Sequence, residues 1–167
     1  LVGNSLALAD GQACYIPLAH NDIEAPPQLK REQVLASMKP LLESANVKKV
    51  GQNLKYDMGV FAHYDIALQG IAHDTMLESY VLNSVASRHN MDDLALNYLG
   101  LSTVHFEDIA GKGVKQLTFN QIELDKAGHY AAENADITFR LHQVLWPRLQ
   151  AEGRLASIYQ DIEIPLI

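Results

Sequence analysis

Two short clusters of polar residues have the types and spacing that could carry metal-dependent or hydrolytic chemistry. The first is Gln52-Asn53-Leu54-Lys55-Tyr56-Asp57, which groups amide, ammonium and carboxylate side chains. The second is Tyr130-Ala131-Ala132-Glu133-Asn134-Ala135-Asp136. Residues four apart on a helix share a face, so Tyr130 and Asn134 would point the same way. Small alanines between them would let a ligand or a neighbouring backbone approach closely.

The first cluster falls where a strand over 48–52 joins a helix over 54–64, with Asn53 as the expected N-cap. Ligands gather at such joins in open α/β sheets. Asp57 stands in the first helical turn, where a carboxylate suits the helix macrodipole. Taken alone, Asp57 could equally be a residue that only stabilises that turn.

The second cluster, taken alone, favours a plain structural interpretation. A helix packed through its alanines would leave Glu133 and Asp136 in solvent. The two clusters together and in this order are more specific than either one.

The remaining pattern predicts strands first, then strands alternating with helices, then mostly helix, which is typical of an α/β fold with a small mixed sheet. The expected strands cover 1–8, 13–18 and 71–73, with a turn at Asp10-Gly11. The expected helices cover 31–45 (with Pro40), 74–83 (capped by Asp74), 91–99 (ended by Gly100), 120–146 (interrupted at Gly128, with Pro147 near its end) and part of 155–167. Residues 109–118 are expected to form a mobile loop.

Net charge, cysteine count and apolar patterning exclude several classes of function. A formal net charge of −7 argues against a basic nucleic-acid binder, but not against an enzyme that meets phosphates through metal ions. Cys14 is the only cysteine, which excludes an internal disulfide and a cysteine-based zinc site. No apolar run approaches the roughly 20 residues of a membrane helix, so no membrane partner is expected. The seven histidines show no recurring metal-binding spacing, and surface or packing roles are expected for them.

Together the two clusters resemble the second and third motifs of the 3′→5′ proofreading-exonuclease domain of bacterial DNA polymerase I. Those motifs are of the types Asn-x-x-Tyr-Asp and Tyr-x-x-x-Asp. The resemblance extends along the whole chain, from Leu1 to the Ile162–Leu166 segment, which is expected to lead toward a polymerase domain. Four further segments look like the same domain in order: Asp74–Tyr80, Asn83–His89, Phe106–Gly113 and Gln116–Ile122.

The resemblance implies one domain over 1–167 with a ribonuclease-H-like fold, a small mixed sheet flanked by helices. It implies hydrolysis of 3′ ends of single-stranded DNA with two divalent ions, Mg²⁺ or Mn²⁺. Asp57 would be a metal-site carboxylate and Tyr130 would orient the attacking water. Phe106 could stack on a terminal base, or simply pack in the core. The residues implied to line the DNA site are Gln52, Asn53, Lys55, Tyr56, Arg88 and Phe106. The implied partners are a DNA 3′ end and a covalently linked polymerase domain, in the bacterial cytoplasm.

The sequence departs from this family pattern at two points. The first motif, a strand carrying Asp-x-Glu before the strand that starts at Leu1, is absent, and the fold is expected to lack this central strand. The aspartate of the third motif falls on Asn134. Asp136 lies two residues further and on another helix face. Asp57 is therefore the one matched carboxylate of four, and we expect weakly occupied or empty metal sites and little or no exonuclease activity.

Two other functions remain open. A catalytically silent structural or single-strand-binding module of a polymerase is favoured by Asn134. A free-standing exoribonuclease of the same superfamily is disfavoured by the polymerase-like segments between Asp74 and Asn120. Gly111-Lys112-Gly113 lacks the ending of a nucleotide-binding phosphate loop, so nucleoside triphosphate binding is rejected.

Overall fold

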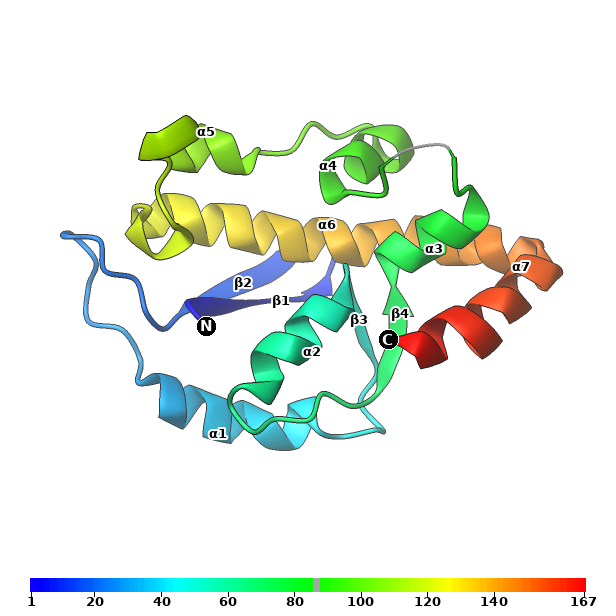
Figure 1. Ribbon diagram of the computed structural model, residues 1–167, viewed down its shortest axis with the longest axis horizontal. Coiled ribbons are helices and arrows are strands. Elements are labelled where there is room, and N and C mark those ends of the chain that lie inside the picture. The colour runs from blue at the N-terminus through cyan, green and yellow to red at the C-terminus, as the bar shows by residue number, and fades with distance from the viewer. Residues whose placement is uncertain (86–87) are drawn as a thin grey trace. The chain divides into compact units, whose positions relative to one another are not determined.

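The computed structural model describes residues 1–85 and 88–167, and the chain forms two compact units (Figure 1). The first unit contains Leu1–Ser37 and Thr103–Asp136, and the second contains Met38–Ser102 and Ile137–Ile167. The single domain expected over 1–167 stays a prediction. Ala86 and Ser87, which fall in the family-like segment Asn83–His89, lie outside the described residues.

A β-hairpin opens the first unit. Strand β1 (Gly3–Ala9) pairs antiparallel with β2 (Gln12–Pro17), in a register that sets Gly3 opposite Pro17. Gly11 has a φ of 69°, which glycine adopts without the steric cost that a Cβ would bring. The hairpin predicted from Asp10-Gly11 is confirmed.

The rest of the first unit is built on short helical pieces around a small core. Helix α5 (Phe106–Ala110) and 3₁₀ turns at Gly113–Lys115 and Phe119–Gln121 precede helix α6, which begins at Leu124. The expected loop over 109–118 is therefore only partly right. Asp108 caps the start of α5, because its carboxylate accepts the backbone N–H of His105 at 3.1 Å. The buried core residues here are Ala110, Ile122 and Ala127.

A parallel strand pair organises the second unit. Strand β3 (Lys49–Gly51) pairs with β4 (Ile71–Asp74), and helix α2 (Leu54–Ala62) connects them. Helix α3 (Thr75–Leu82) follows β4 directly. Helix α4 (Met91–Leu94) continues as a π-helical turn over Ala95–Leu99, which ends at Gly100 as predicted.

The expected small mixed sheet is not formed among the described residues, which instead contain two separate two-stranded sheets. One is the antiparallel β1–β2 pair and the other is the parallel β3–β4 pair. Among the described strands, none hydrogen-bonds to a strand of the other pair. The class of fold, a mixed α/β arrangement, is as predicted, and the missing first strand stays a prediction.

Two long helices contribute to both units. Helix α1 (Arg31–Leu42) contains Pro40 in its last turn. Helix α6 (Leu124–Ala151) is continuous through Gly128 and Pro147, so the predicted interruption at Gly128 was wrong. In the second unit α6 packs on α4 and the turn after it through Leu94, Ala95, Ile137, Leu141 and Leu145.

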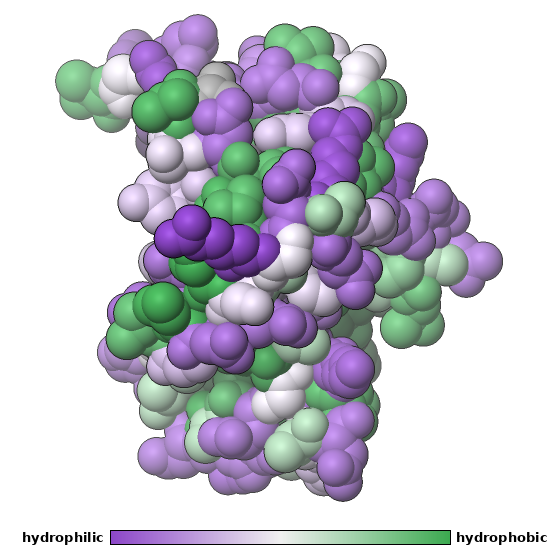
Figure 2. Space-filling model, turned by 90° about the vertical axis from the view of Figure 1, so that its right-hand side faces the viewer, coloured by the Kyte–Doolittle hydropathy of each residue, from purple (hydrophilic) through white to green (hydrophobic). Residues whose placement is uncertain are grey.

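The chain closes with helix α7 (Gly153–Ile158) and helical turns over Tyr159–Glu163 and Ile164–Leu166. On the face drawn in Figure 2, hydrophobic residues are interspersed with hydrophilic ones. Among the described helices there is none whose length and apolar character would let it cross a membrane.

Candidate functional site

The first polar cluster lies at the join of β3 and α2, where it was predicted. Asn53 stands at the N-cap position in the left-handed region, with φ 58° and ψ 49°, and its side chain makes no capping hydrogen bond. Asp74 caps α2 instead. Its Oδ2 accepts the backbone N–H of Leu54 at 2.7 Å, and its Oδ1 accepts that of Asn53 at 3.2 Å. The predicted N-cap position of Asn53 is confirmed, but the capping hydrogen bonds come from Asp74 and not from the Asn53 side chain.

Asp74 also caps the helix that follows it. Its Oδ1 accepts the backbone N–H groups of Met76 at 3.0 Å and Leu77 at 3.3 Å, as predicted for an N-cap aspartate. The backbone N–H of Asp74 donates to the hydroxyl of Tyr159 at 2.9 Å. One carboxylate, only 1% exposed, thus fixes the first turns of both α2 and α3. No local sequence pattern predicts that Asp74 caps α2, because Asp74 and Leu54 are 20 residues apart.

Asp57 lies one turn into α2 and is partly buried. Burial, and then the charge of Asp74, raises the pKa of its carboxyl group from 3.8 to about 6. An anion held under such strain gains from a nearby cation, because a positive charge removes both penalties. Carboxyl groups with a pKa raised in this way are common at functional sites.

The other polar residues of the first cluster differ in how far they are exposed. Gln52 is held in place, because its Oε1 accepts the hydroxyl of Thr75 and its Nε2 donates to the carbonyl of His89 at 2.9 Å. Tyr56 is 71% exposed, and Lys55 is exposed while its Nζ reaches the carbonyl of Leu166 at 3.1 Å. Asn53 and Arg88, also in this unit, are exposed as well. The surface that was predicted to meet DNA is thus open at these four residues.

The second cluster lies on α6 in the first unit. The ring of Tyr130 is half-buried and packs beside Phe106, at 6.1 Å between centroids, and Phe119, at 6.3 Å. Phe106 and Phe119 are themselves 6.5 Å apart. The structure therefore brings two predicted site residues, Phe106 and Tyr130, into one aromatic cluster that borders the core.

Glu133 and Asp136 do not point freely into solvent, as the structural interpretation of this cluster had expected. The Oε2 of Glu133 accepts the backbone N–H of Val104 at 3.1 Å. The Oδ1 of Asp136 accepts the backbone N–H of Gly11 at 2.6 Å and so holds the tip of the hairpin. Both carboxylates serve the packing of the first unit, and Asn134 remains the residue at the motif position.

The described residues do not fit a pair of hard divalent ions. Such a pair needs several carboxylates free to bridge and coordinate it. In the second unit Asp57 has Asp74 beside it, but Asp74 already accepts four backbone N–H groups. Two Asp-x-Glu sequences do occur, Asp22–Glu24 on an exposed turn and Asp161–Glu163 in a helical turn, and neither is on a strand.

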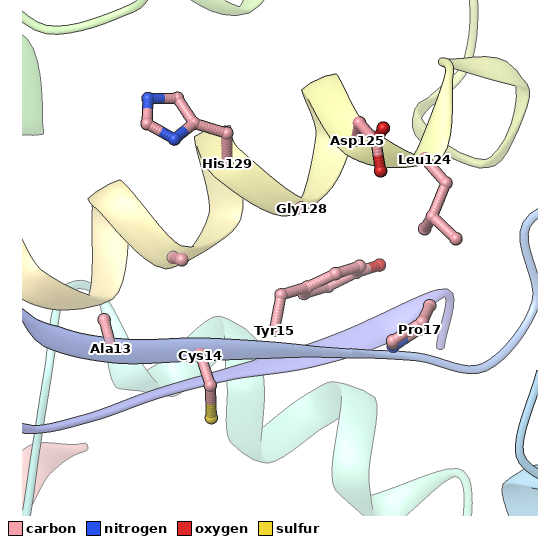
Figure 3. A pocket seen from close by; sticks show the side chains of 9 residues that line it. Ala13, Cys14, Tyr15, Pro17, Leu124, Asp125, Gly128 and His129 are labelled. Carbon is pink, nitrogen blue, oxygen red and sulfur yellow. The ribbon is translucent and has the colours of Figure 1, made fainter.

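An open pocket of about 340 Å³ lies between β2 and α6 in the first unit (Figure 3). The ring of Tyr15 forms its wall, and its hydroxyl lies 2.7 Å from His20 Nε2. Burial raises the pKa of Tyr15 to about 12, which keeps the phenol neutral. The pocket contains no residue of the two clusters except Ala132, which has no polar side chain. Its lining is Ala13, Cys14, Tyr15, Pro17, Leu124, Asp125, Gly128, His129 and Ala132.

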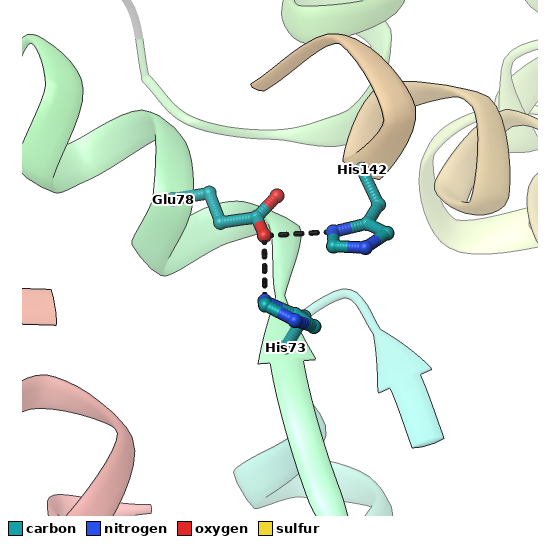
Figure 4. Close-up of side chains that lie close together, drawn as sticks. All are labelled: His73, Glu78 and His142. Atoms are coloured by element: carbon teal, nitrogen blue, oxygen red, sulfur yellow. Dashed lines mark hydrogen bonds and ion pairs between the residues drawn. The ribbon is translucent and has the colours of Figure 1, made fainter. Parts of the chain in front are cut away.

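The structure also assembles a group of side chains that sequence spacing did not predict. His73 from β4, Glu78 from α3 and His142 from α6 converge in the second unit (Figure 4). Glu78 and His142 are 64 residues apart in the chain, so no local motif could signal the contact.

Comparison with known proteins finds one matching family and several related sequences. The protein family described as 3′-5′ exonuclease matches residues 1–150. DNA polymerase I of Pseudomonas aeruginosa is 58% identical over 169 residues, which cover all of this chain and 18% of that protein. DNA polymerase I of Rhizobium leguminosarum is 42% identical, again over all of this chain and 18% of that protein. The chain thus spans less than a fifth of the length of these relatives.

Solved structures support the fold. A structure described as the POL domain of Pol1 from M. smegmatis, in complex with DNA primer-template and dNTP, aligns over 98% of this chain and 24% of its own length. Its TM-score is 0.73 at 21% identity. Brucella melitensis NrnC aligns over 92% of this chain and 67% of its own length, with a TM-score of 0.65 at 20% identity.

Proposed function

The chain belongs to the 3′-5′ exonuclease domain family of DNA polymerase I, and from this premise we propose that it binds the 3′ end of single-stranded DNA and hydrolyses it slowly or not at all. The observation that carries the proposal is Asn134, which stands where the family motif has an aspartate. An amide oxygen is a neutral ligand and adds no negative charge to a divalent ion pair. We propose a ribonuclease-H-like fold over 1–167.

The surrounding carboxylates support this proposal. Glu133 and Asp136 flank Asn134, but each accepts a backbone N–H within the first unit. Recruiting either one to a metal would cost the hydrogen bond that it makes now. Asp57 keeps the metal-binding role that the family assigns to its position, as a single carboxylate that holds one ion weakly. Tyr130 keeps the family position of the residue that orients water.

Binding of single-stranded DNA would use the open surface at the start of α2. Tyr56 offers an exposed ring on which a base can stack, and stacking tolerates any sequence. Lys55 and Arg88 supply positive charge for phosphates, and Asn53 and Gln52 supply amide groups. Because the chain carries a net charge of −7, phosphate contacts add little and stacking carries most of the affinity. As part of a DNA polymerase I, the domain would meet this DNA in the bacterial cytoplasm, beside the linked polymerase domain.

Fluorescence anisotropy with a labelled single-stranded oligonucleotide, in EDTA, tests the binding. Tyr56→Ala should weaken binding about 10-fold, because the loss of one stacked base is worth about 1–3 kcal/mol. Tyr80→Ala, at another exposed tyrosine of the same unit, is the matched control and should leave affinity unchanged. Equal affinity of the Tyr56→Ala variant and the wild type would contradict the proposed surface.

A second candidate function, a silent module, is favoured by the same Asn134. In that case single-stranded DNA binds without metal, and Asn134→Asp in the full-length parent protein restores no cleavage. An exoribonuclease would instead degrade a single-stranded RNA faster than the DNA of the same sequence. Parallel incubation of both substrates with Mg²⁺ and with Mn²⁺ separates these three outcomes.

A further inference from the structure

The group formed by His73, Glu78 and His142 has the composition of a transition-metal site. Oε1 of Glu78 lies 2.8 Å from Nδ1 of His142 and 3.1 Å from Nδ1 of His73. The candidate ligand atoms all lie within 4.8 Å of one another. As Figure 4 shows, the two imidazole rings reach the carboxylate from β4 and α6, while Glu78 extends from the first turn of α3. All three residues belong to the second unit.

The charge of this group is incompletely compensated. Glu78 is 0% exposed, and its Oε2 is buried without a hydrogen-bond partner among the described residues. His73 Nδ1 is also buried and makes no hydrogen bond, although it lies 3.1 Å from Oε1. Burying an anion without a paired cation is costly. Glu78 Oε2 and His73 Nδ1 are thus two buried polar atoms whose hydrogen-bonding capacity a bound group could use.

Simple hydrogen bonding accounts for only part of this arrangement. His142 Nδ1 makes a hydrogen bond to Oε1, which satisfies that pair. The ring of His73 lies 4.2 Å from that of His142 between centroids, tilted by 37°. A metal ion among the three side chains would be bound by both imidazole nitrogens and by the carboxylate together.

We propose that His73, Glu78 and His142 bind one Zn²⁺ ion. Two imidazole nitrogens and one carboxylate oxygen form a donor set that Zn²⁺ prefers and that Mg²⁺ does not. Zn–ligand bonds of about 2.0–2.2 Å place tetrahedral ligands roughly 3.3–3.6 Å apart. The side chains therefore need to separate by roughly 0.5–0.8 Å from the present 2.8 Å, and by roughly 0.2–0.5 Å from the present 3.1 Å.

Aromatic rings form the walls of the site. The ring of Trp146 lies 4.7 Å from that of His73, and Tyr159 is stacked against His73 at 6.1 Å. The side chains of His73 and His142 keep 16% and 18% exposure, which leaves a path for an ion to enter. An ion here would tie β4, α3 and α6 together directly beside Asp74, whose carboxylate holds the start of α2.

The test uses Zn²⁺ and the chain freed of metal by chelation, without DNA. Isothermal titration should give one Zn²⁺ per chain, and Zn²⁺ should raise the Tm by several degrees while an excess of Mg²⁺ has no effect. Co²⁺ in place of Zn²⁺ should give the visible absorption of a tetrahedral site. His142→Gln should weaken Zn²⁺ binding by about 100-fold or more, because one of three protein ligands is lost.

The controls separate this site from other sources of Zn²⁺ binding. His129→Gln removes an exposed histidine from the same helix α6 and should leave Zn²⁺ binding intact. Asp57→Asn should also leave Zn²⁺ binding intact. The Zn²⁺ site can therefore be confirmed even if the proposed DNA function fails its own test. If Glu78→Gln does not fold, the His73→Gln and His142→Gln variants still test whether these side chains bind Zn²⁺. Absence of Zn²⁺ binding by the wild type, or equal binding by His142→Gln, would overturn the proposal in favour of a hydrogen-bonded cluster.

Discussion

Asp57 is a carboxylate whose surroundings favour the protonated form. Burial and the neighbouring Asp74 raise its pKa to about 6, well above the ordinary value of 3.8. Asp74 accepts four backbone N–H groups, which hold its carboxylate in place beside Asp57. The protein thus keeps one electrostatically unfavourable carboxylate at the motif position.

Asp57→Asn should stabilise the metal-free chain at pH 8 by about 1 kcal/mol, a value reduced for the partial exposure of the group. The stability that wild-type Asp57 contributes is full below pH 3.8 and is lost as the pH rises through 6. The difference between variant and wild type should therefore be small at pH 4, grow to pH 6 and then level off. Urea unfolding at these pH values measures it, with exposed Asp161→Asn as the control. A difference that shrinks with rising pH would contradict the assignment.

At the scale of secondary-structure elements, Asp74 joins two helices through one side chain. Asp74→Ala should cost about 2–4 kcal/mol of unfolding free energy, because N–H groups at the starts of both α2 and α3 lose their acceptor. Asp161→Ala, at an exposed aspartate, should change it by less than about 0.5 kcal/mol. Urea denaturation compares the two. If Asp74→Ala lowers the unfolding free energy no more than the control does, the capping of α2 and α3 by Asp74 does not stabilise the chain.

The join of β3 and α2 also depends on glycine. A Cβ at Gly51 would lie 2.3 Å from Cδ2 of buried Leu54, so Gly51→Ala should destabilise the chain by about 1–3 kcal/mol. Gly59, in the interior of α2, has open space around its Cα. Gly59→Ala should instead stabilise the chain by about 0.5–1 kcal/mol through helix propensity. Thermal denaturation of the two variants should shift in opposite directions, and shifts of the same sign would contradict this packing argument.

At the scale of the whole molecule, local signals predicted local structure well. Asp10-Gly11 predicted the hairpin, Asp74 the cap of α3 and Gly100 the end of the helical segment after Met91. Each depends on interactions between residues only a few positions apart. The local pattern placed the polar cluster at the start of α2, and the resemblance identified the family.

Contacts between distant segments could not be predicted from the sequence. The capping of α2 by Asp74, the ties of Glu133 and Asp136 to backbone and the convergence of His73, Glu78 and His142 all join distant segments. The continuity of α6 through Gly128 was also missed, because packing outweighs the low helix propensity of one glycine. The separation into two strand pairs depends on which strands meet in space, which local patterns do not specify.

The most direct test of the central claim is cleavage of a 5′-labelled single-stranded DNA by the full-length parent protein. The wild type, Asn134→Asp and the matched control Asn134→Ala are compared with Mg²⁺ and with Mn²⁺. A metal ligand is worth several kcal/mol, so the aspartate should accelerate 3′ shortening by about 100-fold or more, while wild type and alanine variant leave the label at full length. A ladder of 3′-shortened products from the wild type, as fast as from Asn134→Asp, would contradict the account.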